Sequence, residues 1–111
     1  MGEQALRAET ACGSSYDAPN GALLLRLLGE LGAGNQFLIV DRLDAPNAEH
    51  YMQIYREADG TFTVEYREGA ADRHFETIAG DLRTAFTLLA GWAAGTPGWR
   101  EPCEWRQWPI P

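Results

Sequence analysis

The chain has 111 residues, a hydrophobic fraction of 45% and a formal net charge of −7. This length and composition predict one domain that buries its own core, and they exclude a wholly disordered chain. The acidic charge argues against binding to nucleic acid or to an anionic membrane surface, and it favours a basic partner. The longest apolar run, residues 23–28, is interrupted by Arg26 and is too short to span a bilayer.

The first 18 residues mix Gly, Ser, Ala and acidic residues without a helical or strand period. This composition predicts a flexible N-terminal segment, residues 1–18, followed by a single domain over residues 19–111. The segment lacks an apolar stretch flanked by basic residues, so it does not resemble a secretory signal. We therefore expect a cytoplasmic protein without a membrane attachment.

Cysteine and histidine, which often bind transition metals, are few and scattered. Cys12 and Cys103 lie near opposite ends of the chain and match no zinc-binding spacing. His50 and His74 lie between them and complete no recognisable ligand set. We expect two free thiols in a reducing compartment, and neither a metal nor another cofactor.

Two segments have the apolar spacing of amphipathic helices. Between Asn20 and Gly32, leucines recur at i, i+3, i+4 and i+7, which predicts about three helical turns. Asp81 is placed to cap a second helix over residues 82–94, which ends at Gly95. We expect the core-facing stripe of this second helix to contain Leu82, Ala85, Phe86, Leu89 and Ala93.

The segment from Tyr51 to Arg67 predicts a β-hairpin whose register follows from its side chains. With a two-residue turn, Ile54 would lie opposite Glu65, an apolar group against a charge. A three-residue loop, Ala58–Gly60 with a left-handed Gly60, avoids this conflict. One face of the hairpin then holds Met52, Ile54, Phe62, Val64 and Tyr66. The opposite face holds Tyr51, Gln53, Tyr55, Thr63, Glu65 and Arg67.

Two further strands are expected to flank this hairpin. Residues 35–43 have a β-branched and aromatic centre between turn-forming residues, and residues 73–78 follow a turn at residues 69–72. Four strands joined by short connections predict an antiparallel meander. A sheet with one apolar face must cover it with the apolar stripes of the two helices. We therefore predict an α+β two-layer sandwich in which one face of a four-stranded sheet stays open.

The open face is the candidate functional surface. Tyr and Arg dominate the energetic centres of protein interfaces, because they combine a large contact area with a polar group. The candidate partner-binding residues are Tyr51, Gln53, Tyr55, Glu65, Arg67, His74 and Glu76. The alternative is an ordinary solvated sheet, on which Tyr and Thr are favoured and Glu65 and Arg67 form cross-strand pairs.

A catalytic alternative rests on His74. Together with Glu65 and Glu76 it could form a general acid–base set, because a carboxylate can orient an imidazole for proton transfer. No nucleophile motif or glycine-rich phosphate loop accompanies it, so we assign no catalytic residue and favour a binding protein over an enzyme. A concave pocket beside His74 would favour the catalytic alternative, and a flat surface would count against it.

The last third of the chain is rich in tryptophan. Trp92 falls at the edge of the second helical stripe, which predicts a place in the core. Trp99, Trp105 and Trp108 either anchor an extended tail on the fold or form an exposed patch for a partner.

Three segments of the chain form a recognisable pattern. They are Asp59–Gly69 (DGTFTVEYREG), His74–Thr77 (HFET) and the spaced Trp92, Trp99 and Trp105. Over residues 36–108 this pattern resembles small acidic α+β proteins of high-GC actinobacteria, some of which resemble immunity proteins against bacterial toxins. The resemblance implies a non-catalytic protein that stoichiometrically inhibits a cognate toxin, with a basic toxin domain as its partner.

Two other functions remain open. A small enzyme or ligand-binding domain would use His74 and Glu76 together with Tyr51 or Tyr55. A dimeric protein like a secretion chaperone would instead use the exposed sheet of a small acidic domain. We expect a monomer or a homodimer with a protein partner, and no contact with nucleic acid or a membrane.

Overall fold

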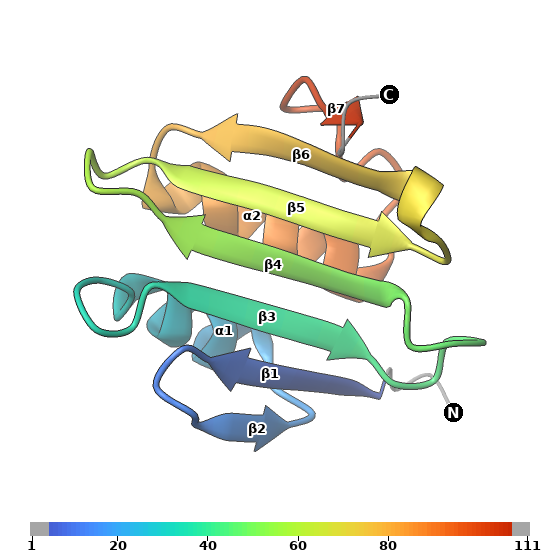
Figure 1. The fold of residues 1–111 in the computed structure, drawn as a ribbon, viewed down its shortest axis with the longest axis horizontal. Helices are drawn as coiled ribbons and strands as arrows, with labels where there is room; N and C mark the ends of the chain where they lie inside the picture. The colour runs from blue at the N-terminus through green and yellow to red at the C-terminus, as the bar shows by residue number, and fades with distance from the viewer. Residues whose placement is uncertain (1–4, 108–111) are drawn as a thin grey trace.

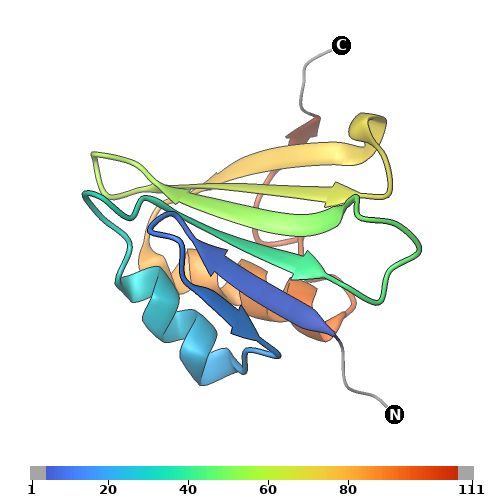
Figure 2. The same ribbon diagram turned by 60° about the horizontal axis from the view of Figure 1, so that its bottom comes forward.

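The computed structural model describes residues 5–107. Its centre is an antiparallel sheet of seven strands in the order β2-β1-β3-β4-β5-β6-β7 (Figure 1). The strands are β1 (Leu6–Thr10), β2 (Ser15–Asp17), β3 (Phe37–Arg42), β4 (His50–Arg56), β5 (Phe62–Glu68), β6 (His74–Ala79) and β7 (Arg106–Gln107). Two helices, α1 (Gly21–Gly29) and α2 (Leu82–Ala94), pack on one face, and a short 3-10 helix, η1 (Ala71–Arg73), precedes β6 (Figure 2). The predicted α+β class is confirmed, but the sheet has seven strands instead of four.

The N-terminal segment predicted to be flexible forms part of the sheet over residues 6–17. Leu6, Ala8 and Thr10 of β1 are buried and alternate with exposed residues, which is the two-residue period of a half-buried strand. β1 pairs with β3, with Leu6 opposite Arg42, and β2 pairs with β1 at the edge of the sheet. The prediction was wrong because β1 is short and has the weak strand former Ala8 at its centre, so its pairing with β3 decides its structure.

Both predicted helices form, and the second begins at the expected N-terminal cap, Asp81. Asn20 accepts a hydrogen bond from the Leu23 N–H, and Asp81 accepts one from the Thr84 N–H. The buried side of α2 differs from the prediction and consists of Ala85, Leu88, Leu89 and Trp92. Leu82, predicted to face the core, is 36% exposed. Because α2 packs against α1 as well as the sheet, two neighbours determine its buried side. Neither helix is long and apolar enough to cross a bilayer.

The β4–β5 hairpin has the predicted register. The Glu57 N–H donates to the Thr61 carbonyl at 2.8 Å, which closes a three-residue loop, and Gly60 has a φ of +89°. Ile54 lies opposite Val64. All five residues predicted for the core face of this hairpin are buried. The side-chain argument from the sequence therefore identified both the turn and the faces.

The C-terminal tail is anchored on the core. The Trp99 and Trp105 rings lie edge-on to Tyr66, with centroids 4.9 Å and 5.0 Å away, and the described part of the tail includes β7. Of the two roles considered for these tryptophans, the structure supports anchoring for Trp99 and Trp105. Trp108 lies outside the described residues.

The two faces of the sheet have different neighbours. Behind the sheet in Figure 1, α1 lies behind β1 and β3, and α2 lies behind β4, β5 and β6. Their leucines join the inward side chains of the strands in one core cluster. The opposite face, which points toward the viewer in Figure 1, is covered by neither α1 nor α2. We call it the open face.

Candidate protein-binding face

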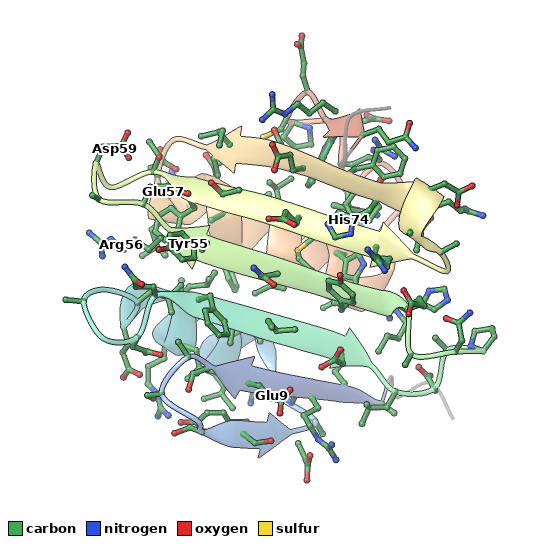
Figure 3. All side chains as sticks on the ribbon, viewed as in Figure 1. Glu9, Tyr55, Arg56, Glu57, Asp59 and His74 are labelled. Carbon is green, nitrogen blue, oxygen red and sulfur yellow. The ribbon has the colours of Figure 1, made fainter. Side chains whose placement is uncertain are left out.

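The open face is formed by alternate residues of five strands, which point away from the helices (Figure 3). By register and alternation these residues are Arg7, Glu9, Phe37, Ile39, Asp41, Tyr51, Gln53, Tyr55, Thr63, Glu65, Arg67, His74, Glu76 and Ile78. Gln53 lies near the middle, opposite Ile39 on one side and opposite Glu65 on the other. Cross-strand neighbours are close enough to contact each other, so the face is one continuous surface.

All seven residues predicted to bind a partner lie on the open face. Tyr51 pairs with Arg67 and Arg67 with His74, which brings residues from three strands into one row. The exposure of two of them differs from the prediction. The sequence predicts exposed side chains at His74 and Glu76, but these residues are only 4% and 8% exposed. Strand alternation identified their face, but their depth depends on neighbouring side chains.

His74 is buried because polar neighbours bond to both of its ring nitrogens. The Arg67 Nε–H donates to His74 Nδ1 at 3.0 Å. Because Nδ1 accepts this bond, the imidazole proton sits on Nε2 and is donated to Glu65 Oε1 at 2.8 Å. The Tyr51 ring lies edge-on to the imidazole, with centroids 5.9 Å apart. A histidine with both ring nitrogens hydrogen-bonded within the protein has a structural role here.

Arg67 connects this histidine to a second carboxylate. Its Nη1 lies 2.5 Å from Glu49 Oε1, and this bond raises the pKa of Arg67. The guanidinium also lies over the Tyr51 ring, 5.8 Å from its centroid. Burial raises the pKa of Tyr51, an effect that Arg67 opposes. The result is a row of alternating donors and acceptors that holds the Tyr51 ring in place.

Glu76 is neutralised by the tail. Arg106 of β7 donates to Glu76 Oε2 from Nε at 2.8 Å, and a second guanidinium N–H points to the same oxygen. Glu65 lies directly opposite Glu76, so two carboxylates face each other across neighbouring strands. Like charges in this position destabilise a sheet unless each has its own partner. His74 and Arg106 supply these partners.

The part of the open face on β1 and β3 was missed by the sequence analysis. Phe37 lies opposite Tyr55, and Asp41 lies opposite Tyr51. These β3 side chains are partly exposed. The available signal was the apolar character of both alternating sets in residues 37–40, which is unusual for a strand with one solvated face. Glu9 was missed because its strand was not predicted.

The electrostatics of Asp41 differ from those of Glu65 and Glu76. Burial raises the pKa of Asp41, the charge of Glu9 raises it further, and Arg7 opposes both effects. Arg7 itself donates from Nε to Asp17 Oδ1 at 3.0 Å. Asp41 is therefore a partly buried carboxylate without a full counter-charge.

Surface cavities lie at the margins of the sheet. One of about 660 Å³ follows the outer edge of β6 and includes Glu76, Ile78 and Arg106 in its lining. Another of about 420 Å³ lies beside the residues that follow α2 and includes His50 and Trp92. His74 lines neither cavity, although its hydrogen-bond partner Arg67 lines the second.

Within residues 5–107, no group of three or more His, Cys, Asp or Glu side chains is positioned to hold a metal ion. Cys12 and Cys103 are free thiols, Cys12 exposed and Cys103 partly buried.

Comparisons with protein-family models, curated proteins and solved structures found no match to this chain. The function is inferred from the geometry of the open face.

Proposed function

We propose that this chain is a non-catalytic binding protein that stoichiometrically inhibits a cognate bacterial toxin by docking through the open face. The observation that carries the proposal is a sheet face that neither helix covers, with its charged and aromatic side chains held in place by one another. The resemblance to toxin-immunity proteins supports the same function.

Side chains held in place bind with a smaller loss of conformational entropy than mobile ones. Arg67 is held by Glu49 and His74, and its guanidinium fixes the orientation of the Tyr51 ring. Tyr and Arg in such an arrangement are the residue types most often found at energetic centres of interfaces. An inhibitor needs no chemistry of its own, because it only has to cover the active site or substrate path of its target.

The acidic charge of the chain supports the proposal that its partner is basic. The chain has a net charge of −7, and Glu9, Asp41, Glu65 and Glu76 all lie on the open face. An acidic surface accelerates association with a basic one and rejects acidic competitors. Toxins that act on nucleic acid or another anionic substrate carry such a basic surface around their active sites.

The surroundings of His74 support a binding protein over the catalytic alternative. Proton transfer to a substrate would require one ring nitrogen to give up its hydrogen bond to Arg67 or Glu65, and His74 is only 4% exposed.

A dimeric chaperone-like protein would also use the open face. Its self-association would be detected by sedimentation at micromolar concentration.

The test begins with affinity capture from the native host, followed by mass spectrometry and a salt titration of any complex. The captured partner, expressed alone in a heterologous bacterium, should arrest growth, and co-expression of this chain should restore it. Tyr55→Lys on the open face should abolish rescue. The matched control Leu25→Lys, at a 42% exposed position on α1, should preserve it. The proposal is wrong if no partner is toxic, and the assignment of the face is wrong if both variants rescue growth equally.

A further inference from the structure

The open face divides into two halves that differ in how their charges are balanced. The β5–β6 half consists of Glu65, Arg67, His74 and Glu76. The β1–β3 half consists of Arg7, Glu9, Phe37, Ile39 and Asp41. In Figure 3, Glu9 lies on β1 and His74 on β6, at well-separated positions on the sheet. In the β5–β6 half every charged group already has a partner within the protein, so this half needs no charge from a docking protein.

The carboxylates of the β1–β3 half lack such partners. Within residues 5–107, neither Glu9 nor Asp41 accepts a hydrogen bond from a described group. Arg7 lies opposite Asp41 in the register, but its Nε–H is donated to Asp17. Two carboxylates therefore share the field of one cation that is already paired. A cation from outside the chain would complete this half of the face.

The surroundings of these carboxylates are aromatic and apolar. Phe37 lies beside Tyr55, Asp41 beside Tyr51, and Ile39 beside Glu9. A guanidinium is planar, stacks on aromatic rings and offers two parallel N–H groups to a carboxylate. A lysine ammonium is strongly hydrated and offers neither a plane nor a fork. The chemistry of this half therefore suits arginine better than lysine.

We infer that the β1–β3 half is the principal contact for the partner, and that its occupant is an arginine side chain on a basic protein surface, bonded to Asp41 and Glu9. This inference rests on the proposed function and names the partner's contact chemistry. The β5–β6 half then keeps the sheet face ordered beside the contact.

The probe is a blocked tripeptide of arginine, phenylalanine and arginine, titrated into the full isotopically labelled chain and followed by NMR. A peptide with lysine in place of arginine tests the geometry of the cation, and one with citrulline keeps the shape of arginine without its charge. Chemical shift changes should centre on Phe37, Ile39, Asp41 and Tyr55. The arginine peptide should bind at least about fivefold more tightly than either control peptide.

Two double variants with equal charge changes decide where the peptide binds. Glu9→Gln with Asp41→Asn should weaken binding of the arginine peptide at least about fivefold. Glu30→Gln with Asp72→Asn removes the same charge at exposed positions outside the open face and should leave binding unchanged. The amide substitutions keep the side-chain shape, and the amide NMR spectrum of each variant reports whether it is folded.

The inference is overturned if the peptide does not bind, if its shifts centre on β5 and β6, or if both double variants weaken binding equally. The toxin assay separates this failure from failure of the proposed function. If the β1–β3 variant still restores growth while Tyr55→Lys does not, inhibition through the open face stands and the arginine contact is wrong. If no toxin is found but the peptide binds as expected, the contact chemistry stands and the proposed function is wrong.

Discussion

The core face and the open face of the sheet use the same strands but become ordered in different ways. On the core face, Ile54 and Val64 are fully buried under the helices, and apolar contact is the stabilising interaction. On the open face, His74 is almost as deeply buried, yet its neighbours Arg67 and Glu65 are polar and bond to it. No buried side-chain nitrogen or oxygen in residues 5–107 lacks a hydrogen bond. A complete polar network can therefore order a sheet face that no helix covers.

The difference between the core face and the open face predicts its largest effect on stability at two adjacent residues of β4. Ile54→Asp would bury an unpaired carboxylate in the core, so we expect the unfolding free energy to fall by about 4 kcal/mol or the protein to fail to fold. Tyr55→Asp, one residue further and on the open face, should cost less than about 1 kcal/mol. Urea unfolding of both variants measures the difference. Equal losses would show that the two faces are not distinct.

The core face also depends on the tail, which crosses α2 at a glycine. A Cβ on Gly91 would lie 2.8 Å from the Trp99 Cβ, so Gly91→Ala must displace the tail. We expect a loss of about 2–3 kcal/mol in unfolding free energy, measured by urea titration with tryptophan fluorescence. The control is Gly29→Ala in α1, whose nearest contact would be Leu82 Cδ2 at 4.0 Å. It should leave stability unchanged or slightly raised, because alanine favours a helix. An unaffected Gly91→Ala would mean that the tail is not packed closely on α2.

His74→Ala tests the polar network of the open face. Removal of the imidazole leaves Glu65 and Arg67 without their shared partner, so we expect a loss of about 1–2 kcal/mol. Tyr55 lies on the same face but has no described hydrogen bond. Tyr55→Ala should therefore lower the unfolding free energy by less than His74→Ala does. Differential scanning calorimetry at neutral pH compares the two. If Tyr55→Ala costs as much, the open face is not ordered by its hydrogen bonds.

Asp41→Asn should have the smallest effect and the opposite sign. Because burial raises the pKa of Asp41, the folded protein holds this proton more tightly than the unfolded chain does. The contribution of Asp41 to stability is therefore unfavourable above the folded pKa and is relieved as the pH falls below it. Asn should raise the unfolding free energy at pH 7 by less than about 1 kcal/mol, because solvent screens a carboxylate at this depth. Unfolding at pH 4 and pH 7 checks this, since the gain should shrink at pH 4. A loss of stability at pH 7 would show that Asp41 has a stabilising partner.

The features that could be predicted from the sequence are those with a local signal. The left-handed Gly60, the cap at Asp81 and the faces of the hairpin all depend on residues within a few positions of each other. Strand β1 was not predicted, because a short strand with Ala8 at its centre is ordered mainly by its pairing with β3. The missing strand also hid Arg7 and Glu9, the β1 residues of the open face.

The sequence by itself determined the positions of the two helices, the hairpin loop and which residues of the hairpin strands share a face, because helix and strand periods are properties of neighbouring residues. Only the tertiary structure decided the depth and partners of the open-face side chains. Arg106 reaches Glu76 from 30 residues away, and Asp41 lies opposite Arg7 and within the field of Glu9 only because β1 pairs with β3. Such pairings depend on which strands become neighbours, and no local period encodes that choice.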